Sequence, residues 1–192
     1  MNVPPSDPAS SSRRSEAQET LVLDDGREVV VAPVTPAARP LIERGIEHVS
    51  AESSRRRFFT VRRRFSDREL DQMTRMDGWR RFALGAVAPG PEGAGIARFA
   101  RSAADPRAAE VAVLVVDAWQ GVGLGRRLMA RIAHAALERG IERLTGIVLP
   151  DNDPMLGMLR RHAPGLALVR TGDHLSVEVR LDARRIEAAL GA

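Results

Sequence analysis

The spacing of apolar and polar residues predicts alternating strands and helices along most of the chain. Apolar residues that alternate with polar ones, or run together between turn residues, indicate strands. These strand patterns lie at residues 21–34, 80–89, 94–103, 109–116, 143–150 and 166–181. Apolar residues spaced three and four apart indicate helices. The helical patterns lie at residues 35–50, 50–78, 123–139, 152–165 and 182–190.

Turn and capping residues refine these elements. Asp25-Gly26 is a type I′ turn signal, so residues 21–34 are predicted to form a hairpin, and residues 166–181 form a second hairpin that closes the domain. Two capping serines, Ser50 and Ser66, divide the pattern over residues 50–78, and we expect a break near Phe65. The role of the last helix is not assigned by its pattern.

The order of elements indicates the fold class. It is β-α-α-β-β-β-α-β-α-β-β, in which antiparallel strands precede a single β-α-β crossover. This order predicts an α+β protein with a mixed, mostly antiparallel sheet and flanking helices, not a repeating doubly wound sheet. Residues 1–19 are rich in serine, proline and charge and are predicted to be a disordered tail, whereas residues 20–192 form a single domain.

Composition narrows the function classes. The 192 residues contain no cysteine, which excludes disulfides, thiolate zinc sites and cysteine nucleophiles and is consistent with a reducing compartment. No apolar run reaches membrane-spanning length, and the N-terminal residues lack the hydrophobic segment of a signal peptide. We therefore expect a cytoplasmic protein with no membrane partner.

All of the 29 basic residues are arginine, because the chain contains no lysine. The net charge is only +4, and a nucleic-acid binder normally places base-stacking aromatic residues beside a basic patch. Only the region around Phe58 and Phe59 has this character. Nucleic acid is therefore not the expected partner, although an arginine-rich nucleic-acid binder is retained as a third hypothesis.

A glycine-rich turn between a strand and a helix is the main candidate for ligand binding. Gly121, Gly123 and Gly125 alternate just before the helical pattern over residues 123–139. A nucleoside triphosphate P-loop is excluded because it needs a lysine. A dinucleotide fold is disfavoured because Arg126 occupies the position of the third glycine in G-x-G-x-x-G.

The remaining interpretation is a pyrophosphate held by backbone N–H groups at the helix N-terminus. The glycines let the backbone approach a ligand closely. Arg126 and Arg127 add positive charge in the first helical turn, where a cation is otherwise unfavourable. A glycine turn that serves only tight packing stays open as the alternative.

A family resemblance supports the pyrophosphate interpretation. The segment WQGVGLGRRLM, after VAVLVVDA, resembles the Q/R-x-x-G-x-G/A signature of the GCN5-related N-acetyltransferases (GNATs), and the element order resembles theirs over residues 27–181. VSAESSRRRFF, followed by IARFARSAADPRAAEVAVLVVDAWQGVGLG, is similar to the acetyltransferase domain of bacterial protein-lysine acetyltransferases of the Pat type.

The resemblance implies a binding site for acetyl-CoA, used as a co-substrate without a metal. In the family, the strand before the signature splays from its neighbour, and its exposed backbone pairs with the pantetheine arm. The matching positions are Leu114, Val115 and Val116. The pyrophosphate would be held by the signature residues Gln120, Gly121, Val122, Gly123, Leu124, Gly125 and Arg126. Asn152 matches an asparagine near the pantetheine, and a helix N-cap is its equal alternative.

Glu110 is the candidate catalytic residue. It begins an apolar strand and shares a face with Ala112 and Leu114. From the sequence alone it is best interpreted as a solvated strand end, but Pat-type enzymes use a glutamate here as the general base. Partial burial would make this carboxylate a stronger base near neutrality. The amine that it deprotonates would attack the thioester, and a backbone N–H near Val115 or Val116 would stabilise the oxyanion.

The family's usual general acid is missing. Many members protonate the leaving thiolate with a tyrosine, but this chain has no tyrosine. His162 lies in a comparable stretch and is better explained as a cation at a helix C-terminus than as an acid. The thiolate would then leave unprotonated or take a proton from water.

The basic segment at residues 53–65 has two interpretations. Phe58, Val61 and Phe65 can share one helical face. The three arginines then left in solvent are Arg56, Arg63 and Arg64. The segment is either a solvated basic face on an anchored helix or an acceptor-side wall that prefers an acidic protein surface.

These observations predict an acetyl-CoA-dependent N-acetyltransferase that acts on a primary amine, plausibly a protein lysine. The alternative from another class is a non-catalytic acyl-CoA-binding sensor or interaction module of the same fold. Binding of acetyl-CoA without acetyl transfer to any amine would favour that alternative.

Overall fold

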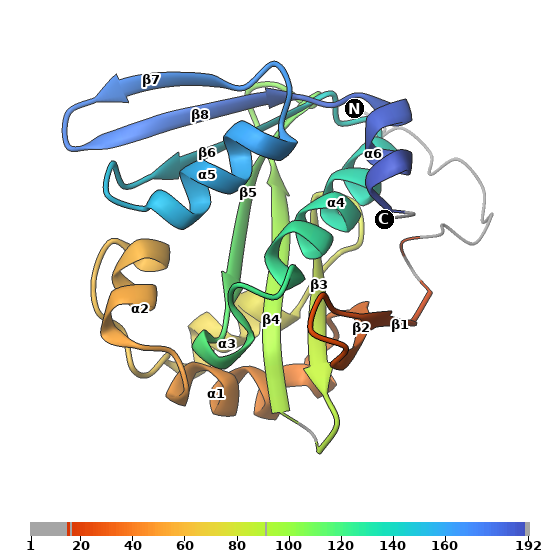
Figure 1. Cartoon of the computed structure of the whole chain (residues 1–192), viewed down its shortest axis with the longest axis vertical. Coiled ribbons are helices and arrows are strands. Elements are labelled where there is room, and N and C mark those ends of the chain that lie inside the picture. Colours follow the sequence, from red (N-terminus) through yellow and green to blue (C-terminus); the bar gives the residue numbers. More distant parts are fainter. Residues whose placement is uncertain (1–14, 16, 91, 191–192) are drawn as a thin grey trace, which may run out of the picture.

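In the computed structural model, which describes Ser15, residues 17–90 and residues 92–190, the chain forms one twisted sheet flanked by helices (Figure 1). In these residues the strand order is β1-β2-β3-β4-β5-β6-β8-β7. The strands are β1 (Glu19–Val22), β2 (Glu28–Pro33), β3 (Arg81–Ala88), β4 (Glu92–Arg101), β5 (Ala108–Val115), β6 (Arg143–Val148), β7 (Ala167–Thr171) and β8 (His174–Arg180). Neighbouring strands are antiparallel except β5 and β6, which are parallel. The predicted α+β class, with a single crossover, is confirmed.

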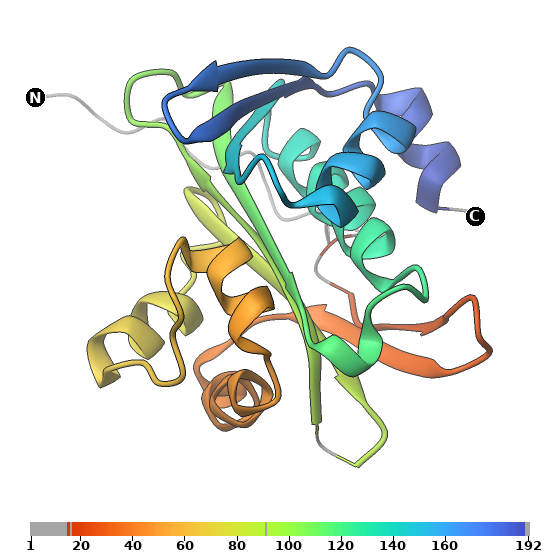
Figure 2. The same ribbon diagram turned by 60° about the vertical axis from the view of Figure 1, so that its left-hand side comes forward.

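Helices cover both faces of the sheet. They are α1 (Arg39–Glu47), α2 (Ala51–Phe58), α3 (Asp67–Thr74), α4 (Leu124–Leu137), α5 (Asp153–His162) and α6 (Ala183–Leu190), with 3₁₀ turns η2 (Pro36–Ala38) and η3 (Asp117–Trp119). Figure 2 shows α1, α2 and α3 on one side of the sheet and α4, α5 and α6 on the other. The last helix, α6, packs against α4, which gives it the structural role that its sequence pattern left open.

The main core lies between α4 and the centre of the sheet. Leu124, Leu128 and Ile132 follow the predicted helical spacing and are fully buried. They belong to one apolar cluster with Phe82 of β3 and Phe99 of β4. Truncating one such leucine to alanine typically costs about 2–5 kcal/mol. This cluster fixes α4, and therefore the glycine turn before it, against the sheet.

The region after α2 differs from its prediction. The serine caps are confirmed, since Ser50 Oγ accepts from Ser53 N and Ser66 caps α3. The helical pattern is interrupted over residues 59–66, which includes the expected position near Phe65, but α2 already ends at Phe58 and is followed by Phe59 with a left-handed φ of 61°. Phe58 and Phe65 therefore share no helical face with Val61, which is exposed. The two phenylalanine rings still meet, with centroids 5.2 Å apart, because the loop folds back on α2.

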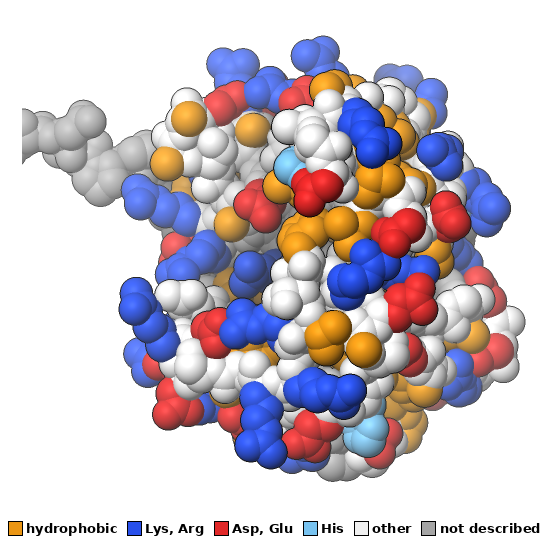
Figure 3. All heavy atoms as spheres, turned by 90° about the vertical axis from the view of Figure 1, so that its left-hand side faces the viewer, with side chains coloured by type: hydrophobic (Ala, Val, Ile, Leu, Met, Phe, Trp, Pro, Cys, Tyr) orange, Lys and Arg blue, Asp and Glu red, His pale blue; other side chains and the backbone are white. Residues whose placement is uncertain are grey.

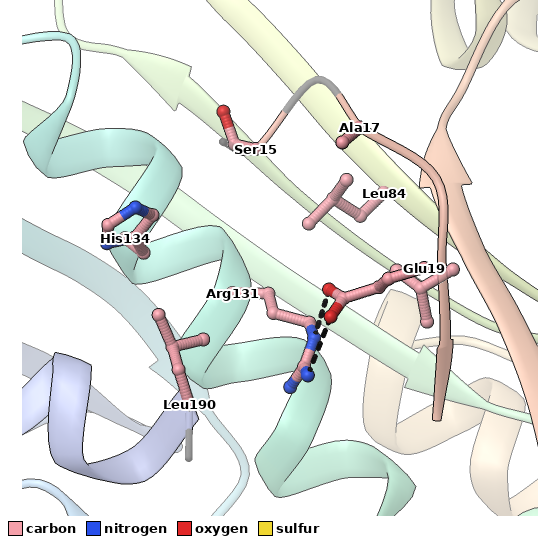
Figure 4. Close-up of a pocket in the computed structure, with 8 residues that line it drawn as sticks. Ser15, Ala17, Glu19, Leu84, Arg131, His134 and Leu190 are labelled. Carbon is pink, nitrogen blue, oxygen red and sulfur yellow. Dashed lines mark hydrogen bonds and ion pairs between the residues drawn. The ribbon is translucent and has the colours of Figure 1, made fainter. Parts of the chain in front are cut away.

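The first strand begins inside the predicted tail. Residues 1–14 and 16 lie outside the described residues, but Glu19 opens β1. Its carboxylate binds the buried guanidinium of Arg131 through two hydrogen bonds of 2.5 and 3.1 Å (Figure 4). The cavity beside this pair, of about 30 Å³, has room for about one water molecule and none for a coenzyme.

Candidate functional site

The strands β5 and β6 are paired only at one end. Their parallel register covers Ala108 with Arg143, Ala109 with Leu144, and Glu110 with Thr145. Beyond Glu110 the two strands diverge, although β5 continues to Val115 and β6 to Val148 (Figure 1). The splay that the family resemblance implies is therefore present, and Glu110 is the last β5 residue before it.

The pairing of β5 with β4 decides which backbone groups face the splay. Val116 N donates to Ala94 O of β4 at 2.9 Å. Because successive residues of a strand point their N–H and C=O groups in opposite directions, Leu114 also bonds towards β4, whereas Val113 and Val115 point into the splay. This arrangement corrects the expectation that exposed backbone at Leu114 and Val116 would meet the coenzyme. Of the three predicted positions, only Val115 presents its main chain there.

The glutamine of the signature links the end of β5 to α2. Gln120 Nε2 donates to Val115 O and to Ser53 Oγ of α2, at 3.0 Å in each case. The carbonyl oxygen of Val115 thereby accepts a hydrogen bond from Gln120, so the N–H of Val115 is the backbone group that remains for a ligand. Gln120 thus fixes the strand end and α2 relative to the glycine turn.

Two of the turn glycines are required by backbone conformation. Gly121 and Gly123 have φ values of 75° and 84°, in the left-handed region that other residues rarely adopt. A Cβ added to Gly123 would also lie 2.5 Å from Asp24 Oδ2. Gly125 is different, because a Cβ there would meet its nearest neighbour, Val115 Cγ2, at an ordinary 3.6 Å.

The N-terminus of α4 presents backbone donors that the helix does not use. Gly123 is the N-cap residue and supplies no side-chain cap, and Arg127 N makes a helical bond to Gly123 O at 3.2 Å. The preceding amides of Leu124, Gly125 and Arg126 have no acceptor inside the helix. Together with the positive end of the helix dipole, they form a site suited to an anion.

The arginine side chains of this first turn are paired with another element. Asp24, at the end of the β1 side of the hairpin, binds Arg126 Nη2 at 2.7 Å and Arg127 Nη2 at 3.4 Å. Partial loss of solvation acts to raise the pKa of Asp24, but the hydrogen bonds and charges of Arg126 and Arg127 outweigh it and lower that pKa. The guanidinium of Arg126 therefore pairs with Asp24. The backbone N–H of Arg126 is the group that remains to bind an anion at the helix N-terminus.

Glu110 lies on the face of the sheet opposite α4. Val111, Val113 and Val115 pack against the α4 core, so the alternate residue Glu110 points to the side covered by α1–α3. Its side chain is exposed, which agrees with the solvated strand end favoured by the sequence alone, and the partial burial that would strengthen it as a base is not found. In the register Glu110 lies opposite Ala100, which makes Arg98 of β4 a diagonal neighbour on the same face.

Other predicted positions have structural partners. Asn152 is buried and is the N-cap of α5, with Oδ1 accepting from Met155 N at 3.3 Å. This confirms the capping role, and the amide nitrogen of Asn152 keeps two further donors. His162 is exposed at the last residue of α5, as expected for a cation at a helix C-terminus.

Sequence reasoning missed the contacts that hold α2 in place. Asp117 Oδ1 accepts from Ser50 N at 3.1 Å, and Arg55 forms a 2.6 Å ion pair with Asp151. Asp117 follows β5 and Asp151 follows β6, so α2 is joined to both sides of the splay. The partners are 67 and 96 residues apart in the chain, and no local pattern reveals such pairs.

The described residues contain no group of three or more histidine, cysteine or acidic side chains placed to hold a metal ion. No helix in the described part of the chain has both the length and the apolar character required to cross a bilayer.

Comparison with known proteins places this site in a family. Residues 49–163 match the model of the acetyltransferase (GNAT) family. The GNAT domain of Streptomyces lividans Pat is structurally similar, with a TM-score of 0.79 and 32% sequence identity over 85% of this chain and 97% of that one.

Two more distant structures share the fold. One is a cAMP-binding acyltransferase from Mycobacterium smegmatis, with a TM-score of 0.61 and 24% identity; the match covers 93% of this chain and 55% of that one. The other is a putative acetyltransferase from Salmonella typhimurium, solved with its cofactor acetyl-CoA, with a TM-score of 0.58 and 20% identity over 81% of this chain and 95% of that one. The chain therefore belongs to the GNAT family, as an N-acetyltransferase that uses acetyl-CoA as its co-substrate.

Proposed function

We propose that the protein transfers an acetyl group from acetyl-CoA to the side-chain amine of a protein lysine, with Glu110 as the general base. The observation that carries this proposal is the place of Glu110 at the last β5–β6 pair, where the splay begins. Support for a lysine acceptor comes from the resemblance to Pat-type protein-lysine acetyltransferases. The sequence identity to the Pat GNAT domain is 32% over most of both chains.

The residues around the splay are suited to the coenzyme. Val113 and Val115 present backbone groups that could pair with the amides of a pantetheine arm, as an added strand would. The unpaired amides of Leu124, Gly125 and Arg126 could bind the pyrophosphate at the α4 N-terminus. Gly121 and Gly123 shape that turn, and the Asn152 amide nitrogen is a further donor towards the arm.

Acetyl-CoA supplies, when bound, a thioester that is activated towards an amine. Glu110 would accept a proton from the acceptor ammonium, directly or through one water, because only the neutral amine is a nucleophile. Its exposed carboxylate can return that proton to solvent. The N–H of Val113, which also points into the splay and lies nearer to Glu110 than Val115 does, would donate to the thioester carbonyl oxygen, where negative charge develops.

The bonds and protons of the reaction can be accounted for without a further catalytic residue. A bond forms between the amine nitrogen and the acetyl carbon, and the carbon–sulfur bond breaks. The nitrogen loses two protons in total. Glu110 takes the first, and the second passes to solvent water once the carbon–nitrogen bond has formed. The sequence has no tyrosine, and His162 is exposed at the end of α5, so the thiolate would take its proton from water.

The test is a turnover assay with matched acceptors. Release of free CoA is measured with a lysine-containing peptide, the same peptide with that lysine acetylated, a peptide whose only amine is its N-terminus, and a small polyamine. We expect the lysine peptide to react fastest and to gain one acetyl group on the lysine by mass spectrometry. Faster reaction of another amine would overturn the lysine assignment, and acetyl-CoA binding without any turnover would indicate the sensor function instead.

A further inference from the structure

Two arginines flank Glu110 on the face covered by α2. Arg98 shares this face of the sheet as the diagonal neighbour of Glu110. Arg57 comes from α2, which contacts β5, and its guanidinium lies 4.9 Å from the centre of the Phe58 ring. Both side chains are half-buried. Figure 3 looks onto the side of the molecule that carries α2, where arginine side chains are prominent.

These two arginines lack the partners that nearby arginines have. Arg55 pairs with Asp151, and Arg56 pairs with Glu52. Within the described residues, no carboxylate lies within ion-pair distance of Arg57 or Arg98, and neither guanidinium makes a hydrogen bond. The charge on this part of the surface is therefore not balanced by direct contacts.

The electrostatic environment agrees with this imbalance. Loss of solvation, followed by the positive charge of Arg98, lowers the pKa of Arg57 to about 10, and Glu110 acts in the opposite direction. Loss of solvation also lowers the pKa of Arg98, again against the attraction of Glu110. Both side chains remain protonated at neutral pH, so two positive charges share the one carboxylate.

The guanidinium groups can be reached from solvent. The side-chain nitrogens that are enclosed without a partner in the described structure belong to Arg56, Arg101 and Arg127. Since Arg57 and Arg98 make no hydrogen bonds and are not among them, their nitrogens keep contact with solvent. A ligand approaching Glu110 on this face could therefore contact both.

We propose that Arg57 and Arg98 form a carboxylate-binding subsite beside Glu110, which selects an acceptor lysine with an acidic residue next to it in the peptide. This inference rests on the proposed function, because the amine must come to Glu110. A guanidinium binds a carboxylate through paired hydrogen bonds, and partial burial strengthens that interaction. An acidic neighbour of the lysine would supply the charge that the subsite lacks.

The test compares two peptides that differ only in whether the residue next to the single lysine is aspartate or asparagine. For the wild-type protein we expect kcat/KM to be at least about tenfold higher for the aspartate peptide, the scale of one charge-assisted hydrogen bond. In Arg98→Gln and Arg57→Gln we expect most of this preference to be lost. The measure is the ratio of kcat/KM between the two peptides, in which any effect of the variant on Glu110 common to both peptides cancels. Arg184→Gln, an exposed arginine on α6, is the charge-matched control and should keep the preference.

Two further measurements separate binding from general damage. The preference should weaken as salt rises, because the attraction is electrostatic. Arg98→Lys should restore part of the preference, since it keeps the charge without the paired donors. The melting temperature of each glutamine variant should equal that of the wild-type protein or be slightly higher, because the substitution removes a partly desolvated charge that has no ion-pair partner.

The outcomes are distinct from failure of the proposed function. Turnover of both peptides at equal rates by the wild-type protein, or a preference that survives in both glutamine variants, would overturn the subsite while leaving the acetyltransfer proposal intact. Single lysine derivatives test a different ligand for the subsite. Faster turnover of Nα-acetyl-lysine than of its C-terminal amide, with no effect of the neighbouring residue in peptides, would mean that the subsite binds the α-carboxylate of a free amino acid, and would overturn the assignment to an acidic peptide neighbour. No turnover of any lysine would instead refute the proposed function.

Discussion

Asp24 of the β1–β2 hairpin lies against the glycine turn and accepts a hydrogen bond from Arg126 Nη2 at 2.7 Å. Its backbone N also donates to Val122 O at 3.2 Å, so the hairpin and the turn are joined by main chain and side chain. The carboxylate is thus held beside the amides that we propose for the pyrophosphate. Binding of a pyrophosphate would place like charges close together there.

Replacing Asp24 should therefore strengthen coenzyme binding. In Asp24→Asn the repulsion is removed and Arg126 and Arg127 become available to the anion, so we expect the Kd for CoA to fall by about three- to tenfold at low salt, and by less at high salt. The melting temperature without CoA should fall because two ion pairs are lost. Calorimetric titration at two salt concentrations measures the effect.

Asp25→Asn is the matched control for this change, because Asp25 in the same turn pairs with Arg27 and not with the α4 arginines. Its Kd for CoA should stay close to that of the wild-type protein. Unchanged or weaker binding by Asp24→Asn at low salt would contradict the expected repulsion.

The glycine turn allows a sharper comparison between two alanine substitutions. Gly123→Ala forces a left-handed φ on alanine and places its Cβ against Asp24, so we expect at least a tenfold loss of CoA affinity and a lower melting temperature. Gly125→Ala has neither problem and lies inside a helix, where alanine is favoured. It should bind CoA nearly normally and melt at the same temperature or slightly higher. Equal behaviour of the two variants in titration and thermal melts would refute this distinction.

Glu110→Gln tests the proposed base. Loss of a general base typically lowers the rate about 10²–10⁴-fold, and because the carboxylate lies on the acceptor side, the Kd for acetyl-CoA should be unchanged. Glu28→Gln, an exposed glutamate that opens β2, removes the same charge at a distant position and should keep full activity. The rates are compared by CoA release with saturating acetyl-CoA. Full turnover by Glu110→Gln would rule out this residue as the base.

The sequence predicted those features that depend on local chemistry. Helical spacing placed Leu124, Leu128 and Ile132 on one buried face, as found. Ser50 and Ser66 began helices because their hydroxyls accept from backbone amides a turn later.

Features that depend on contacts between distant segments could not be predicted from the sequence. The direction of the backbone groups at Leu114 and Val116 follows from the register with β4, which alternation of side chains does not reveal. The pairing of Asp24 with Arg126 joins residues 102 positions apart. Glu110 is exposed, as the sequence alone indicated for a solvated strand end, but its place at the end of the β5–β6 pairing depends on a strand that lies later in the chain.

The loop that follows α2 is anchored by Glu69, and this anchor should depend on pH. Ser66 N donates to Glu69 Oε2 at 2.9 Å, and Arg62 pairs with Glu69 Oε1 at 2.6 Å. The backbone and side-chain hydrogen bonds of Ser66, and then Arg62, lower the pKa of Glu69 from 4.5 to about 2. A pKa that is depressed in the folded state gives stability that is fully present above the unfolded value and is lost as pH falls towards the folded value.

We therefore expect the wild-type protein to melt at a higher temperature than Glu69→Gln from neutral pH down to about 4.5, with the difference shrinking between pH 4.5 and about 2. Thermal melts of both proteins across this range measure it. Glu187→Gln, an exposed glutamate on α6 with no ion pair in the described part of the chain, should show little difference at any pH. If the melting-temperature difference between the wild-type protein and Glu69→Gln persisted unchanged down to pH 2, the ionised carboxylate would not be its cause. The difference would then come from the geometry of the capping hydrogen bonds, which does not depend on charge.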